Sequence, residues 1–164
     1  MTRAESRSSF DAFVAARWGA LTRTAYLLTG NHHDAEDLVQ TALVKAVAVW
    51  RRIGDDPEPY VRRILVNENI SRWRKHRGRE VVGSTPYDEP VTGDDADRRI
   101  ALADALARLT PKQRTVLVLR FYEDLTERQV AELMGIGIGT VKSQTRDALA
   151  RLRAVAPEVG ELVG

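Results

Sequence analysis

The chain has 164 residues, of which 29% are charged and 43% are hydrophobic, with 25 Lys and Arg against 23 Asp and Glu. That length suits one ordinary domain or two small ones, and the apolar share is large enough for a core, which excludes wholesale disorder. The absence of cysteine excludes disulfides and thiol nucleophiles, and no apolar run approaches the roughly 18 residues of a membrane span.

Helical periodicity dominates the first half of the chain. Apolar residues recur at intervals of three and four in three stretches: 10–28, 34–53 and 60–77. Gly30 follows the first stretch and is typical of a helix C-cap, and Asp34 is predicted to cap the next helix. Residues 54–59 (GDDPEP) are predicted to form a loop, because they contain glycine and two prolines.

The second half opens with residues 78–97, whose glycines and prolines interrupt any apolar period and indicate a flexible linker. Helical patterns then resume over about four further helices. Thr110 and Thr126 each begin a capping box, with a glutamine three residues later. The predicted fold is all-α. Two small helical domains span residues 1–77 and 98–157, a linker spans 78–97, and a tail spans 158–164.

The last two predicted helices have the spacing of a helix-turn-helix. Ala131 permits close helix packing, Gly135 supplies the turn, and Val141 packs the second helix onto the first. The outer face of the second helix carries polar and basic side chains that suit a DNA major groove about 12 Å wide: Thr140, Lys142, Ser143 and Arg146. A solvated helix of an ordinary bundle is the alternative.

Charge is segregated along the chain. Residues 60–80 carry seven basic and two acidic side chains, residues 84–97 carry five acidic and no basic ones, and residues 98–157 carry eleven basic and six acidic ones. Two basic blocks around an acidic spacer suit contact with a polyanion at two places, because phosphate neutralisation supplies most non-specific affinity for nucleic acid. Solvated helix faces are the alternative explanation of such charge runs.

Two faces of the first-half helices carry further candidate residues. One side of the helix predicted over 60–77 presents basic and polar groups that suit phosphates and base edges: Arg63, Asn67, Ser71 and Arg74. Trp73 could stack on a base or pack in the core, and its spacing favours packing. The outward face of the helix predicted over 34–53 includes an apolar residue, Val44, which points to a protein partner.

Nearly the whole chain resembles a bacterial extracytoplasmic-function sigma factor, the dissociable promoter-recognition subunit of RNA polymerase. The motifs that carry the resemblance are DAEDLVQ at 34–40 and GTVKSQT at 139–145. Between them, YVRRILVNENISRWRK is similar to the minus-ten-reading helix of the family. The VNENISRWRK variant and the excess of arginine over lysine resemble the actinobacterial sigma-E-like group.

The resemblance implies a role for each surface. The clamp helices of core RNA polymerase would bind Asp37, Gln40, Thr41 and Val44. The minus-ten element of promoter DNA would be opened by Arg62, Arg63, Asn67, Ser71 and Arg74, with a flipped base held at the 54–59 loop. The minus-thirty-five element would be read by Thr140, Lys142, Ser143 and Arg146. We therefore expect a cytoplasmic monomer with no catalytic residue, cofactor, metal ion or membrane insertion.

Two positions depart from the pattern of the family. Gly137 stands where a serine or threonine cap is usual, which weakens the start of the last helix. Asp147 stands where many relatives carry a base, so it either repels phosphate or accepts a hydrogen bond from cytosine.

Other interpretations remain open at this point. A stand-alone DNA-binding regulator would use the same helix-turn-helix, but it needs a dimer. A metal enzyme would draw on His32, His33, Asp34, Glu36 and Asp37, although capping and helix-dipole effects explain these residues better. The acidic linker, with Asp94, Asp95 and Asp97, could fold back on the basic helix. The family commonly uses an anti-sigma partner for silencing, which the sequence neither shows nor excludes.

Overall fold

The computed structural model describes residues 2–75 and 94–159, and the regular elements within these ranges are all helical. In chain order they are α1 (Arg3–Thr29), α2 (His32–Ala48), α3 (Trp50–Ile53), α4 (Glu58–Lys75), α5 (Asp94–Leu106), α6 (Pro111–Leu117), the π-helix η1 (Val118–Tyr122), α7 (Glu127–Met134) and α8 (Ile138–Val155). The all-α prediction is therefore confirmed for the described ranges. The hypothesis of a folded-back linker falls mainly on residues 76–93, which lie outside them.

Helices α1 and α2 begin earlier than predicted. The hydroxyl of Thr2 accepts a hydrogen bond from the Glu5 N–H at 3.1 Å, and the Glu5 carboxylate accepts one from the Thr2 N–H at 2.7 Å. The first turns of α1 are largely exposed and carry no apolar stripe, so periodicity missed them. The cap of α2 is Asn31, whose side chain accepts from the Asp34 N–H at 3.1 Å, so the assignment of the cap to Asp34 was wrong.

The stretch predicted as one helix over 34–53 is two helices, α2 and the single turn α3. Val49 interrupts it, with φ −119° and ψ 14°. The interruption places Trp50 in the core, where its ring centroid lies 5.1 Å from that of Phe10 and 5.3 Å from that of Phe13. Aromatic packing against α1 therefore overrides the continuous helical pattern.

Helix α4 begins at Glu58, two residues before its predicted start, so the loop spans 54–57. Pro59 lies in the first turn, where its missing N–H breaks no helical hydrogen bond. Arg17 of α1 fixes this end of α4, because its guanidinium donates to both carboxylate oxygens of Glu58 at 2.7 and 2.6 Å. The same hydrogen bonds raise the pKa of Arg17 above its ordinary value.

The second half contains the capping boxes that the sequence predicts. Thr110 opens α6 and Thr126 opens α7, each paired with the glutamine three residues later. Helix α6 continues directly into the π-helix η1, which the sequence did not predict. Helix α5 begins at Asp94, four residues before its predicted start at residue 98, so the last residues assigned to the linker are helical.

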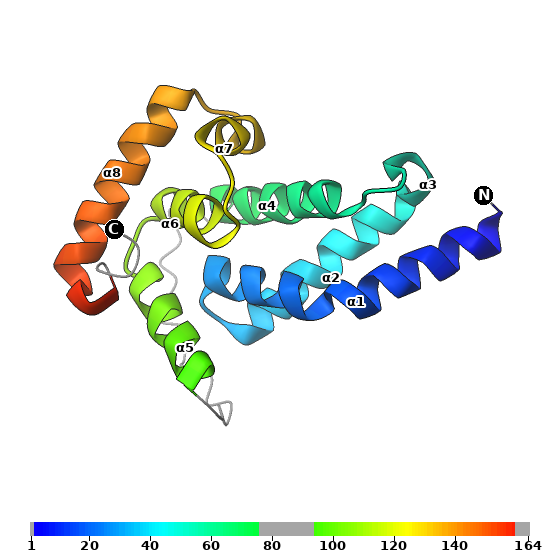
Figure 1. Cartoon of the computed structure of the whole chain (residues 1–164), viewed down its shortest axis with the longest axis horizontal. Helices are drawn as coiled ribbons and strands as arrows, with labels where there is room; N and C mark the ends of the chain where they lie inside the picture. Colours follow the sequence, from blue (N-terminus) through cyan, green and yellow to red (C-terminus); the bar gives the residue numbers. More distant parts are fainter. Residues whose placement is uncertain (1, 76–93, 160–164) are drawn as a thin grey trace.

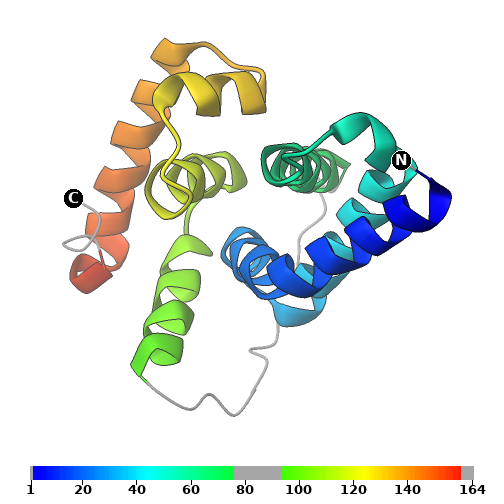
Figure 2. The same ribbon diagram turned by 45° about the vertical axis from the view of Figure 1, so that its right-hand side comes forward.

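Figures 1 and 2 show α1–α4 as one group and α5–α8 as a second group that packs against it. One hydrophobic cluster lies within the first group and joins α1, α2 and α4. Two further clusters contain residues from both groups: Leu27 and Leu28 of α1 join α5, α6 and α8, and Val66 and Ile70 of α4 join α6 and α7. The two helical regions therefore share cores, which the sequence did not predict.

Candidate nucleic-acid interfaces

The helix-turn-helix consists of α7, which begins after the predicted Thr126 cap, and α8, which follows the predicted turn at Gly135. Gly135 takes the left-handed conformation, φ 66° and ψ 37°, that ends α7. Ala131 and Val141 are buried where the two helices meet, as predicted. Gly137 occupies the N-cap of α8 without any side-chain hydrogen bond, which leaves this helix start uncapped. Ile138, the first residue of α8, is 40% exposed, so the inward face of the helix begins at Val141.

The outer face of α8 carries the four residues predicted to read DNA. Lys142 and Arg146 are exposed, and Thr140 and Ser143 are half-buried. The Ser143 hydroxyl donates to the Thr140 carbonyl at 3.1 Å, within the helix. Arg146 contacts its neighbour Asp147, with Nε 3.3 Å from the carboxylate oxygen. Asp147 therefore pairs with Arg146, the arginine that the resemblance assigns to contact with DNA.

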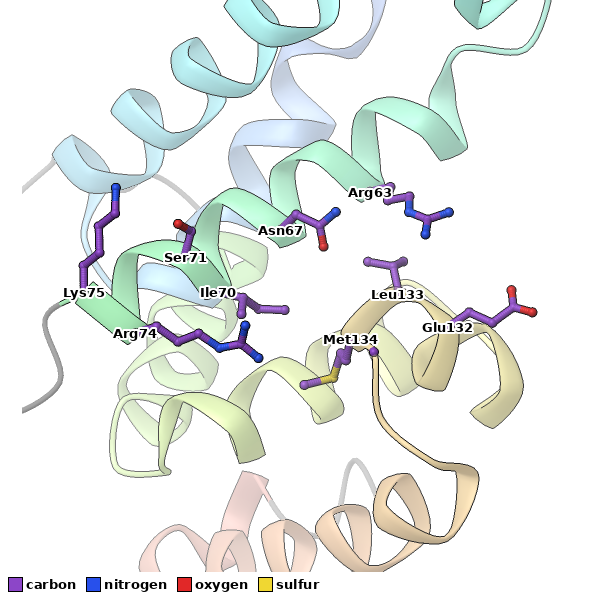
Figure 3. Close-up of a pocket in the computed structure, with 10 residues that line it drawn as sticks. Arg63, Asn67, Ile70, Ser71, Arg74, Lys75, Glu132, Leu133 and Met134 are labelled. Carbon is purple, nitrogen blue, oxygen red and sulfur yellow. The ribbon is translucent and has the colours of Figure 1, made fainter.

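The basic stripe of α4 faces α7 across a cavity of about 580 Å³, shown in Figure 3. The stripe residues that line the cavity are Arg63, Asn67, Ser71 and Arg74, followed by Lys75 at the end of the helix. Glu132, Leu133 and Met134 of α7 form the opposite wall. The structure thus brings these four predicted residues together on one face.

Arg62, the fifth residue predicted for the minus-ten element, lies away from that cavity. It is half-buried, and its Nε lies 3.1 Å from a carboxylate oxygen of Glu123, which follows η1. The Glu123 carboxylate also accepts a hydrogen bond from the Thr24 hydroxyl of α1. Glu123 therefore links both helical regions, and no sequence pattern singled it out.

Trp73 packs in the hydrophobic cluster between α4 and α7, as its spacing favoured. Its indole Nε1 is buried without a hydrogen-bond partner. The Arg74 guanidinium lies 5.6 Å from the centroid of the same ring. Trp73 is half-buried, so its packing in this cluster agrees with the core interpretation rather than with stacking on a base.

The predicted polymerase-binding face lies on the outer side of α2. Val44 is 67% exposed and Gln40 is exposed beside it. Arg72 of α4 organises the rest, because its Nη2 lies 3.0 Å from the Asp37 carboxylate and donates to the Thr41 hydroxyl at 3.0 Å. All four predicted residues therefore share one surface, and α4 holds two of them in position.

Two basic features escaped the sequence reasoning. Arg114 is half-buried and donates to the carbonyls of Leu28, at 3.0 Å, and of Leu106, at 3.0 Å. Burial lowers the pKa of this guanidinium. A cavity of about 810 Å³ lies beside Trp50, and four arginines line it: Arg3, Arg7, Arg51 and Arg52. Tertiary packing brings the first pair, near the start of α1, next to the second pair in α3.

The metal hypothesis gains no support from the described ranges. No group of three or more histidine, aspartate or glutamate side chains within them could hold a metal ion. His32 stacks on Tyr26, with ring centroids 4.4 Å apart. Within the same ranges, no helix combines the length and the apolar character of a membrane span.

Comparisons with known proteins identify both regions. A family model described as Sigma-70 region 2 matches residues 6–79, and one described as Sigma-70 region 4 matches residues 105–154. The chain is 39% identical to an RNA polymerase sigma-E factor of Streptomyces coelicolor, over 88% of this chain and 84% of that protein. It is 35% identical to the ECF RNA polymerase sigma factor SigL of Mycobacterium tuberculosis, over 94% and 90%.

Among solved structures, the chain resembles the sigma factor RpoE of Bartonella quintana, determined in complex with the anti-sigma factor NepR. The TM-score is 0.71 at 30% identity, and the match covers 89% of this chain and 95% of the other. Both sigma regions, in the expected order, thus lie on the two helical groups described above. The chain belongs to the extracytoplasmic-function sigma factors, the promoter-recognising subunits of bacterial RNA polymerase, and within them to the sigma-E-like group.

Proposed function

We propose that this sigma factor divides promoter recognition among three helices. Helix α2 docks on the clamp helices of core polymerase, α4 binds and opens the minus-ten element, and α8 reads the minus-thirty-five element. The observation that carries the proposal is the placement of the three candidate residue sets on three separate faces. We also propose two functional units, 1–77 and 98–157, joined by the 78–97 linker and followed by a 158–164 tail.

Docking through α2 rests on the chemistry of its outer face. Val44 offers an exposed apolar contact, and Gln40 offers an adjacent hydrogen-bonding group. Asp37 keeps its position through Arg72. An apolar centre with a polar surround is the usual composition of a protein interface, and exposure of Val44 to water is otherwise unfavourable.

Opening of the minus-ten element rests on α4 and the adjoining loop. Unstacking a base costs a few kcal/mol, so contacts with the captured single strand must offset that cost. Arg63 and Arg74 supply phosphate contacts and Asn67 supplies base-edge hydrogen bonds. The 54–57 loop lies immediately before α4, and we propose that it holds a flipped base.

Reading of the minus-thirty-five element rests on α8. Its exposed Lys142 and Arg146 suit phosphate or guanine contacts, and the small Thr140 and Ser143 allow the helix to approach base edges. Neither α4 nor α8 offers many phosphate contacts alone. Attachment of both to polymerase raises their effective concentration at the promoter.

We further propose that the protein itself performs no chemistry on nucleotides and works in the cytoplasm, where polymerase meets the chromosome. A relative of known structure is bound by an anti-sigma factor, and we propose that an anti-sigma partner also controls this chain. The free chain is proposed to be a monomer that needs no cofactor.

Reconstitution with core polymerase and a randomised promoter library tests the proposal. We expect initiation only when the sigma factor is present, at promoters with two conserved elements. Asn67→Ala should relax base preference at the minus-ten element alone, and Ser143→Ala at the minus-thirty-five element alone. Tight binding of a palindrome by a dimer of the chain, without polymerase, would refute the proposal in favour of a stand-alone regulator.

A further inference from the structure

The cavity of about 810 Å³ beside Trp50 concentrates positive charge outside the three proposed contact faces. We call this space the arginine cavity. Its lining includes two arginines from α1 and two from α3: Arg3, Arg7, Arg51 and Arg52. Four arginines against a single acid in the lining, Asp11, give it a net charge of +3.

The charges of the arginine cavity are not neutralised within the protein. The four arginine side chains are exposed, and none has an ion-pair or hydrogen-bond partner among residues 2–75 and 94–159. The carboxylate of Glu5, on the same turn of α1, is engaged in the helix cap. By contrast, Arg17 and Arg72 of the same region each bind a carboxylate. Because gathered like charges repel one another, a bound anion would stabilise this cluster.

Packing fixes the two helices that carry the cluster. Trp50 of α3 is 6% exposed, and its ring lies against those of Phe10 and Phe13 of α1. Its indole Nε1 also donates to the Ser9 hydroxyl at 3.3 Å. The buried Ser6 of α1 lines the cavity beneath the arginines of its own helix. The arginines therefore project from a fixed base, which lowers the entropic cost of binding.

The arginine cavity lies at the downstream end of the proposed DNA path. Figures 1 and 2 show α8 at one end of the molecule, α3 and the start of α1 at the other, and α4 between them. The minus-thirty-five element lies upstream of the minus-ten element, so the α8 end faces upstream. DNA that runs from α8 along α4 next reaches the 54–57 loop and then α3, which directly precedes that loop.

The chemistry of the lining suits phosphate groups rather than bases. A guanidinium group binds phosphate through paired hydrogen bonds and reads no sequence there. The lining offers no exposed aromatic face for stacking, since Phe10 is half-buried and Trp50 is buried. The strand opened at the minus-ten element stays single as far as the transcription start. It is the non-template strand, because the template strand must enter the polymerase.

We propose that the arginine cavity binds phosphates of the non-template strand downstream of the minus-ten element. The inference rests on the proposed function of α4 and α8. Contacts in the cavity hold the opened strand after it leaves the 54–57 loop and oppose its return to the duplex. They depend on charge and not on base sequence.

Arg7→Gln with Arg51→Gln tests the site, because the pair removes one exposed charge from each helix. Arg23→Gln with Arg98→Gln is the matched control, since it removes the same charge from exposed positions outside the cavity. Each double variant is assembled with core polymerase. Affinity is measured on forked promoter DNA whose non-template tail either ends with the minus-ten element or continues downstream.

We expect the Arg7 and Arg51 substitutions to lower affinity for the longer tail about tenfold and to leave affinity for the shorter tail unchanged. On the longer tail, the slope of log affinity against log salt should become shallower by about 1.4, or about 0.7 for each lost phosphate contact. The control pair should match the wild-type chain on both tails. Equal affinities of the two double variants for the longer tail would overturn the site.

Uncharged methylphosphonate linkages in the downstream tail provide an independent test. They should weaken binding of the wild-type holoenzyme about as much as the two arginine substitutions do. They should have little further effect on that variant, because both changes remove the same contacts. A change of the downstream bases should leave the difference between the variants unaltered. Fully additive losses would overturn the proposed contact.

Two further outcomes separate this inference from the proposed function. Weaker binding of core polymerase by the Arg7 and Arg51 variant in the absence of DNA would mean that the cavity holds an acidic surface of polymerase, and it would overturn the inference alone. Unchanged binding of the shorter tail by Asn67→Ala would instead overturn the proposed function of α4.

Discussion

Gly137 at the start of α8 allows a quantitative test of the helix-turn-helix geometry. The residue takes φ −75° and ψ 156°, which any amino acid can adopt, and an added Cβ would meet nothing within 4 Å. Gly137→Ser should therefore stabilise the chain through two effects. Loss of freedom in the unfolded chain contributes about 0.4–1 kcal/mol, and a serine cap adds a few tenths of a kcal/mol over glycine.

The sum is about 1 kcal/mol, which should raise Tm by roughly 2–4 °C for a chain of this size. Urea unfolding followed by far-UV circular dichroism measures the free-energy change. Gly137→Ala is the control, because it reduces the same unfolded-state freedom but caps about 1 kcal/mol less well than serine. We expect it to be close to neutral. Equal stabilisation by both variants would mean that no hydroxyl cap forms at position 137.

Three further changes address the other surfaces. Val44→Asp should weaken core polymerase binding at least tenfold in a pull-down titration, while the free energy of unfolding changes by less than about 0.5 kcal/mol. Ala101→Asp on α5 is the control, and an equal loss of polymerase binding in that variant would contradict a specific α2 interface. Asp147→Ala should raise affinity for all minus-thirty-five sequences by freeing Arg146, measured on a randomised element; loss of preference at one base pair would instead indicate a cytosine contact. Leu119→Ala, at a fully buried position, should lower the free energy of unfolding by about 2–5 kcal/mol, and a change below about 1 kcal/mol would mean that the shared cluster is loosely packed.

Local signals in the sequence predict the elements that carry the candidate sites. The Thr126 capping box and Gly135 define both ends of α7, because caps depend on residues three or four apart. Apolar spacing likewise predicts that α4 is a helix and that Trp73 packs inward. These features depend on neighbours in the chain, so a single sequence contains the information.

Features that depend on distant residues were not predictable in the same way. Val49 breaks the α2–α3 stretch because Trp50 finds Phe10 and Phe13 in another helix. Likewise, the Glu123 carboxylate contacts Arg62 of α4 and Thr24 of α1, which lie far earlier in the chain. Periodicity contains no information on such encounters, which is why the prediction treated the two regions as separate.

In helix α8, the side chains that pack in the core differ from the side chains proposed to contact DNA. Val141, Ala148 and Leu152 are buried and hold the helix in the protein, while Lys142 and Arg146 project outward and make little contribution to the core. The outward positions can therefore change without unfolding the helix. If α8 reads DNA as proposed, a few exchanges on this one surface would direct a duplicated copy to a new set of genes, while every copy would continue to share a single polymerase.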